Sequence, residues 1–311
     1  MTILLILYRK SPYMMRISGF PWNSFFNTLY YMIKYFEKKM NSSDIYDSSR
    51  KIPRTLQEIR EVHQYRFLLI QLVRRDILTR YKRSFLGVAW TMLNPLGIMI
   101  VMTIVFSHLF GSTPGYPVFV LSGLLVWNFF SKSTSAAMNS MVWGGGLLKR
   151  IYLPRSSFSL SAIGTEIVNM ILSLVPLILV MLVTRFPFHI SMLYLPVSIL
   201  MISLFSLGMA LLLSTFSVVF PDVVEMYQII LTAWMYLTPI IYPVTTFPEK
   251  YRYLMVYNPL AYFVALFHIP IYEGRTPTWM EFWPALAIGL GMLFVGWFFF
   301  SKKIDEFAYR A

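Results

Sequence analysis

Long runs of apolar residues, separated by short polar segments, dominate the chain from about residue 85 to its end. A helix needs about 20 consecutive apolar residues to cross the hydrocarbon core of a bilayer. Six runs are of this order, and they cover approximately residues 85–110, 117–138, 158–184, 191–219, 226–242 and 282–300. The pattern predicts an all-α membrane protein with six transmembrane helices.

An amphipathic segment precedes the first run. From Gln57 to Arg75, apolar residues recur at spacings of three and four, with arginines and glutamines on the other side. We therefore expect an interface helix on the cytoplasmic membrane surface within residues 56–84, leading into the transmembrane domain at 85–311. Residues 1–55 mix aromatic pieces with lysines and end in a polar run, so they predict an N-terminal extension. The aromatic part is either a membrane-surface amphipathic helix or disordered, and the polar run Asn41–Arg54 is interpreted as a linker.

The connection between the fifth and sixth runs is long, rich in proline and partly apolar. Within it, the apolar stretch Tyr262–Tyr272 is too short to cross a bilayer. It predicts a re-entrant or interfacial segment on the extracytoplasmic side.

The distribution of charge sets the orientation. Charged residues make up only 13% of the chain, against about 25% in a soluble domain. Of the 27 Lys and Arg residues, 16 precede the first run, and 23 fall on the same side as the N-terminus. Basic residues are enriched in cytoplasmic loops, so both termini are predicted to be cytoplasmic. The net charge of +13 then reports topology, and no nucleic-acid partner is expected.

Several kinds of chemistry find no support in the sequence. Cysteine is absent and the four histidines lie far apart, which argues against thiol chemistry and a histidine metal site. No GxxxxGK[ST] phosphate-binding loop is present, so no cofactor is predicted in this chain. The apolar start Thr2–Leu7 precedes its basic pair, which is the reverse of a cleavable signal peptide.

The segment Gly144–Arg155 has the most distinctive composition among the loops. A glycine triplet frees the backbone to turn, and two basic residues, an aromatic residue and a proline follow. Two interpretations stay open on these residues alone. The segment is either a coupling helix that presses on a cytoplasmic motor subunit or an ordinary charged loop.

Several segments together resemble one protein family. In order and at similar separations, they resemble the polysaccharide-export ABC permeases, the type-2 permeases that export O-antigen, capsule or teichoic acid. The resemblance starts near residue 66 and rests on Arg80–Trp90 with Asn94-Pro95, Pro117 with Gly123–Phe130, Leu148–Arg155, Pro239–Pro243 and Asn258-Pro259. Two features depart from the family pattern: Phe220-Pro221-Asp222 lacks the usual basic residue, and Lys132 is a charge where none is expected.

The resemblance implies a homodimeric conduit with partners. A second copy of the chain would pair with the first, and two ABC ATPase subunits would bind ATP and Mg²⁺ below them in the bacterial inner membrane. The substrate would be a lipid-linked glycan of the undecaprenyl-pyrophosphate type. The ATPases would contact the interface helix and a coupling segment whose candidate residues are Lys149, Arg150, Tyr152, Pro154 and Arg155.

Candidate pathway residues are of two kinds. Aromatic faces suit sugars, although Trp and Tyr also anchor proteins at membrane interfaces; the candidates are Trp90, Trp127, Phe130, Trp234, Tyr236 and Tyr242. At the inner mouth, Arg80, Lys82 and Arg83 either attract a pyrophosphate or set topology. Lys132 either snorkels to the inner interface or meets an anionic head group. Glu166, an acid inside the third run, is either functional or interfacial.

Other functions compete with a permease of this family. An ABC exporter of a drug or lipid would share the same features. A stand-alone secondary transporter would show internal repeats and ionisable relays, and neither is evident. A membrane enzyme of glycan assembly would need acid and base residues clustered at one membrane face, and the scattered histidines and acids do not provide them.

Overall fold

Every regular element in the described part of the computed structural model is helical, as predicted. The structure describes residues 54–82, 87, 89–106, 115–143, 154–244, 250 and 253–303. The predicted N-terminal extension up to residue 53 lies outside this description, as do Arg83, Lys149, Arg150 and Tyr152.

The interface region consists of two helices, where the sequence predicted one. Helix α3 spans Arg54–Gln64 and helix α4 spans Arg66–Tyr81. Between them Tyr65 has φ −94° and ψ 17°, outside the α-helical region. Its N–H still closes α3 on the Glu61 carbonyl at 2.8 Å, while its own carbonyl accepts from Leu68 in α4 at 2.9 Å. The break redirects the chain, so that α4 packs along α8.

In the described part of the chain, four helical segments are long and apolar enough to cross a membrane. They are α5 (Ala89–Phe106), α8 (Ser156–Val183), the continuous pair η2 (Ile190–Tyr194) and α9 (Leu195–Val219), and α13 (Trp279–Lys303). They correspond to the first, third, fourth and sixth predicted spans. The chain is therefore a multi-pass membrane protein.

The other two predicted spans are helical but differ in character. Helix α6 (Tyr116–Trp143) has 28 residues, and its second half is rich in serine and contains Lys132. Helix α10 (Val223–Leu237) is apolar but has 15 residues, which gives about 22 Å of length against about 30 Å of hydrocarbon. The six-span topology stays a prediction.

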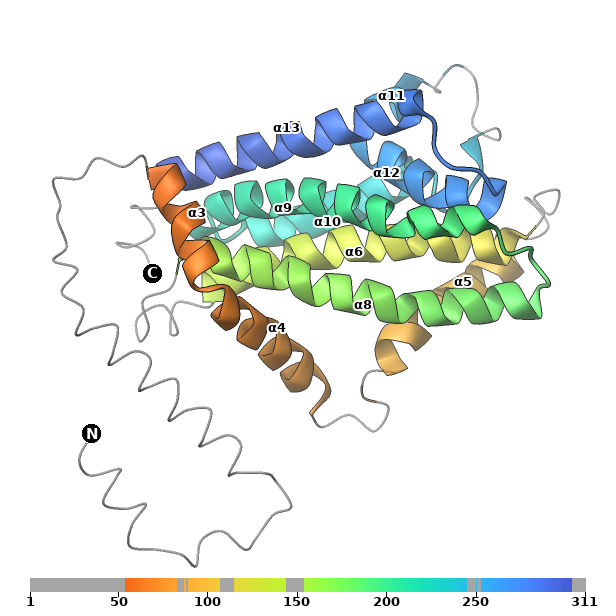
Figure 1. Cartoon of the computed structure of the whole chain (residues 1–311), viewed down its shortest axis with the longest axis horizontal. Coiled ribbons are helices and arrows are strands. Elements are labelled where there is room, and N and C mark those ends of the chain that lie inside the picture. Colours follow the sequence, from red (N-terminus) through yellow and green to blue (C-terminus); the bar gives the residue numbers. More distant parts are fainter. Residues whose placement is uncertain are drawn as a thin grey trace, which may run out of the picture. The chain divides into compact units, whose positions relative to one another are not determined.

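Helix α6 is the centre of the packing. It contacts α5, α8, α9, α10 and α12, and Figure 1 shows it running beside α8 and α9. Side chains on all its faces are buried, including Val118, Val126 and Phe130. Because neighbouring helices shield it from lipid, α6 can carry serines, asparagines and a lysine that a lipid-facing helix could not.

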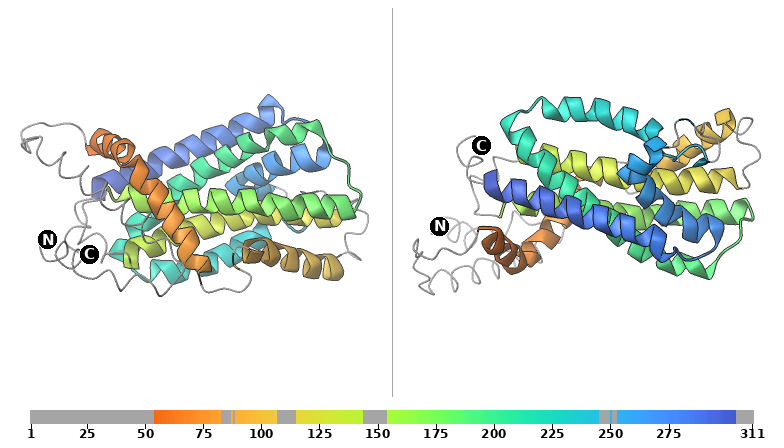
Figure 2. Two further views of the ribbon diagram at one scale, coloured as in Figure 1. Left: turned by 60° about the horizontal axis from the view of Figure 1, so that its bottom comes forward. Right: turned by 90° about the horizontal axis from the view of Figure 1, so that it is seen from above.

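Helices α9 and α13 approach each other closely at two glycines. They pack against each other: they lie side by side in the left view of Figure 2, and α13 crosses in front of α9 in the right view. A Cβ added to Gly296 would overlap the carbonyl of Gly208, and one added to Gly208 would overlap the backbone of Met292. Small residues at such positions let helix backbones meet within a membrane, which gains dispersion energy where no hydrophobic driving force acts.

The connection between α10 and α13 folds back into the helices. It contains α11 (Tyr253–Tyr257), α12 (Pro259–His268) and the π-helical turn η5 (Ile269–Glu273). Asn258 fixes the start of α12: its Oδ1 accepts from the Leu260 N–H at 3.1 Å and from Trp234 Nε1 at 2.9 Å. Phe263 and Phe267 are buried against the other helices. The short helix is as the sequence predicted, and its re-entrant placement in a bilayer stays a prediction.

Candidate functional site

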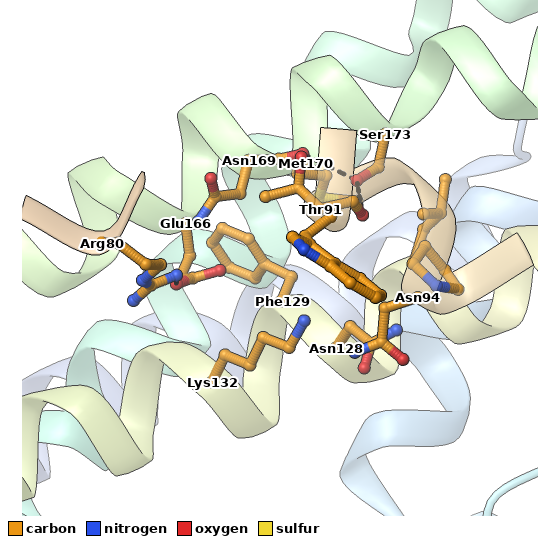
Figure 3. A pocket seen from close by; sticks show the side chains of 13 residues that line it. Arg80, Thr91, Asn94, Asn128, Phe129, Lys132, Glu166, Asn169, Met170 and Ser173 are labelled. Carbon is orange, nitrogen blue, oxygen red and sulfur yellow. Dashed lines mark hydrogen bonds and ion pairs between the residues drawn. The ribbon is translucent and has the colours of Figure 1, made fainter. Parts of the chain in front are cut away.

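A pocket of about 180 Å³ lies where the interface region meets the first membrane helix. Four helices form it, and Figure 3 shows their side chains converging. The end of α4 and the first turns of α5 supply Arg80, Trp90, Thr91, Asn94 and Pro95. The middle of α6 and of α8 supply Leu125, Asn128, Phe129, Lys132, Glu166, Asn169, Met170 and Ser173. The pocket therefore joins segments that are up to about 90 residues apart in the sequence.

A proline positions α5 against α8 at the pocket. Pro95 lies inside α5 and is buried. Since proline has no N–H, the carbonyl of Thr91 loses its usual helical donor. The Ser173 hydroxyl on α8 donates to the Asn169 carbonyl of its own helix at 2.8 Å and also lies 3.3 Å from the Thr91 carbonyl oxygen. Its single hydrogen is shared between the two, so the contact between helices compensates only in part for the donor that the proline removes.

An ion pair closes the pocket on the α4 side. Arg80 Nη1 donates to Glu166 Oε1 at 3.0 Å. The Glu166 side chain is only 3% exposed, whereas that of Arg80 is 41% exposed. A carboxylate at this depth requires a cation, so the arginine fastens the end of α4 to the middle of α8. Glu166, which the sequence left as functional or interfacial, is a buried member of the pocket wall.

Lys132 extends from α6 into the pocket and is half-buried there. Glu166 attracts its charge and Arg80 repels it. Within the described ranges, its ammonium group has no hydrogen-bond or ion-pair partner. Because the carboxylate of Glu166 is already bound to Arg80, the pocket has two cations and one anion.

Two amides in the pocket wall also have unsatisfied polar atoms. Asn128 Nδ2 and Asn169 Oδ1 are both buried, and neither has a hydrogen-bond partner among the residues that the structure describes. Asn169 is only 6% exposed. A buried polar atom without a partner costs about 1–3 kcal/mol, so such atoms point to a missing partner. The pocket thus presents a free donor, a free acceptor and a free cation.

The structure distributes the predicted aromatic residues over several places. Trp90 lines the pocket and is 53% exposed. Trp127 and Phe130 are buried in the core, where Phe130 contacts the rings of Phe205 and Trp234 at 5.6 and 5.4 Å. Phe130 is fully enclosed, and Trp127 is 7% exposed. Their predicted contact with substrate stays a prediction.

The remaining aromatic candidates gather near the end of α10. Trp234 is bonded to Asn258, and Tyr236 is exposed. The Tyr242 hydroxyl donates to the Tyr236 carbonyl at 2.8 Å. These three residues therefore lie together but apart from the pocket. Of the predicted inner-mouth cations, Arg80 lines the pocket and Lys82 is exposed.

A second polar contact ties α3 to the start of α8, directly after the predicted coupling segment. Pro154 is buried and Arg155 immediately precedes α8. Glu58 Oε1 accepts from the N–H of Ser156 at 3.3 Å and from its hydroxyl at 3.2 Å. Glu58 is 5% exposed, and burial raises the pKa of its carboxyl above the ordinary value of 4.5. The interface region is thus fastened to α8 at both ends.

Sequence reasoning missed Glu58, Asn128 and Asn169. The two asparagines carried a usable signal, because an amide inside a hydrocarbon-length apolar run is costly unless it faces a partner or a cavity. Glu58 carried none, since an acid on an amphipathic surface helix ordinarily faces water.

Comparison with known proteins adds independent information. A family model described as ABC-2 type transporter matches residues 68–272. The O-antigen export system permease protein RfbA of Myxococcus xanthus is 33% identical over 255 residues, which cover 80% of this chain and 97% of the relative. A protein of the same description from Klebsiella pneumoniae is 27% identical over 196 residues, covering 62% and 76%. The polysialic acid transport protein KpsM of Escherichia coli is 22% identical over 204 residues, covering 64% and 79%.

Proposed function

The chain belongs to the ABC-2 type transporter family, and we propose that it is the permease subunit of an ATP-driven exporter of lipid-linked polysaccharide. The observation that carries this proposal is the similarity to an O-antigen export permease over nearly the whole length of that relative. The similarity to a polysialic acid transport protein supports a glycan as cargo. The long apolar helices provide the membrane domain that such a subunit requires.

The proposed topology has six spans with both termini in the cytoplasm of a bacterial inner membrane. The excess of basic residues before α5 and after α13 supports this orientation. Helix α6 crosses despite Lys132, because other helices surround it. Helix α10 and the turn after it form the fifth span, and α12 belongs to the re-entrant segment on the extracytoplasmic side.

The proposed energy source is a pair of ATPase subunits that bind ATP and Mg²⁺, while this chain binds no cofactor and catalyses no reaction. Two copies of the chain form the conduit. The ATPases contact Lys149, Arg150, Tyr152, Pro154 and Arg155 and the interface region. Since Ser156 follows Arg155 directly and is bonded to Glu58, a push on the coupling segment reaches α3 and α8 together.

A charge reversal in the coupling segment tests this proposal. Lys149→Glu combined with Arg150→Glu should abolish display of the polysaccharide in cells that lack the native permease. The reason is that an acidic coupling segment would no longer match the surface of the ATPase subunit that it contacts. The permease should still be inserted at normal levels. As the matched control, Lys149→Arg with Arg150→Lys keeps both charges and should retain export.

Two results would contradict the proposal. Normal export by the charge-reversed variant would refute the coupling assignment. Transport or ATP hydrolysis by the purified chain without a partner would refute the dependence on a separate ATPase.

A further inference from the structure

The pocket between α4, α5, α6 and α8 has the properties of an anion site. We infer that it binds the phosphoryl head group of the substrate's lipid anchor, a phosphate or diphosphate ester, with Lys132 as the principal cation. This inference rests on the proposed function and assigns a place to one part of the cargo. The charge, hydrogen-bonding groups, location and size of the pocket support it.

The charge of the pocket favours an anion. Glu166 is already bound to Arg80 at 3.0 Å, and the described residues offer Lys132 no second carboxylate. An ammonium group without a partner in a half-buried site is electrostatically costly. A phosphoryl group bound there would remove that cost and gain charge-assisted hydrogen bonds.

The direction of the Lys132 side chain argues against simple snorkelling. Figure 3 shows it directed into the pocket on the side of Asn128, which lies one turn earlier on α6. A snorkelling lysine would instead extend towards the end of α6 at Trp143. Its charge is therefore kept among the helices, where intramembrane cations mark substrate or ion pathways.

The unsatisfied amides complement the same ligand. Asn128 and Lys132 are four residues apart on α6 and so share one face. The free Nδ2 of Asn128 and the ammonium of Lys132 are both donors, which suits phosphoryl oxygens. On the facing helix, the free Oδ1 of Asn169 is an acceptor, which suits a hydroxyl group. A glycosyl phosphate offers both groups side by side.

The location and size suit a head group at a membrane. Water occupies about 30 Å³ per molecule, so a pocket of about 180 Å³ holds a phosphate or diphosphate but no polysaccharide. Trp90, on the open side of the pocket, is half-exposed, and the adjoining face of α5 is apolar, with Ile100 and Ile104 more than half exposed. A hydrocarbon tail can lie along that face while its phosphoryl group enters the pocket.

Direct binding to the full-length chain in nanodiscs tests the inference. The ATPase subunit is omitted because it would bind phosphates itself. Radiolabelled farnesyl diphosphate is the probe, with farnesol and inorganic pyrophosphate as competitors. We expect farnesyl diphosphate to bind, pyrophosphate to compete more weakly, and farnesol not to compete.

Three variants assign the binding to the pocket. Lys132→Gln should weaken the affinity for farnesyl diphosphate at least tenfold, because the cation is lost. Lys132→Arg keeps the charge and should remain within threefold of the wild type, which shows that the pocket stays intact. Lys302→Gln removes an equal charge at the exposed end of α13 and should bind as the wild type. Gel filtration checks that each variant is folded.

Several results would overturn the inference. Wild-type affinity in a folded Lys132→Gln variant would refute the role of Lys132. Equal affinity for pyrophosphate and farnesyl diphosphate would show that the pocket binds a free anion and does not recognise a lipid head group. Competition by farnesol would show that the chain binds the apolar tail and not the diphosphate. Export in cells separates this inference from the proposed function. If the wild type restores export and Lys132→Gln binds and exports normally, the assignment of the head group to the pocket is refuted and the proposed function stands. If the wild-type chain fails to restore export, the proposed function itself is refuted.

Discussion

Replacing Glu58 with alanine should detach α3 from the base of α8 and uncouple export. Glu58 supplies the acceptor for both the N–H and the hydroxyl of Ser156, at 3.3 and 3.2 Å. Ser156 is completely buried, so water cannot replace the lost acceptor. The contact joins segments 98 positions apart, next to the predicted coupling segment.

The structure allows the magnitude to be worked out. Each buried donor left without an acceptor costs about 1–3 kcal/mol. Removing the carboxylate also relieves the cost of burying it, which is the largest cause of its raised pKa. Two stranded donors would together cost about 2–6 kcal/mol, and the relief of burial opposes this, so the net loss is smaller, about 1–3 kcal/mol. This corresponds to roughly a 5- to 150-fold shift toward the state in which α3 is detached.

Hydrogen–deuterium exchange of the 54–64 segment measures that shift in the assembled transporter. Glu58→Ala should accelerate exchange there by the stated factor and lower export, while ATP hydrolysis continues. Glu58→Gln retains an acceptor and should behave nearly as the wild type. Glu225→Ala removes an exposed acid at the start of α10 and serves as the control. Unchanged exchange in a folded Glu58→Ala variant would refute the proposed fastening.

Three further predictions follow from burial and packing. The pKa of Glu58 is raised in the folded state, so docking of α3 should be strongest below the ordinary pKa of 4.5 and should weaken as the pH rises through the raised pKa. Hydrogen–deuterium exchange of residues 54–64 measures the docking, and in Glu58→Gln the docking should not depend on pH in this way. Gly296→Leu should overlap Gly208 and lower the free energy of unfolding by about 1–3 kcal/mol or more, which thermal unfolding would show as a lower midpoint. Gly291→Leu has open space around it and should leave the midpoint unchanged. Arg80→Ala should destabilise the chain by about 1–2 kcal/mol, because the buried Glu166 carboxylate loses its ion-pair partner and keeps only the attraction of Lys132. Thermal unfolding of Arg80→Ala with Glu166→Gln should show partial recovery.

The sequence alone determined which segments are helical and nearly where they end. The third predicted span, 158–184, corresponds to Ser156–Val183, and the fourth, 191–219, to Ile190–Val219. The sixth, 282–300, lies within Trp279–Lys303. In hydrocarbon every backbone N–H and C=O must bond within its own helix, so apolar length fixes a helix before any tertiary contact forms.

Only the tertiary structure decided which helix is central and which polar groups meet. By composition α6 is among the more polar long helices, yet it is the most enclosed. Phe130 is a core residue and Trp90 a pocket residue, although both are aromatic residues in apolar runs. The pairs Arg80–Glu166 and Glu58–Ser156 join positions 86 and 98 residues apart. The length of an apolar run is a property of one segment and can be obtained from its sequence. The partner of a buried charge depends on which helices pack together, because packing requires complementary shapes and close contact between segments distant in the sequence.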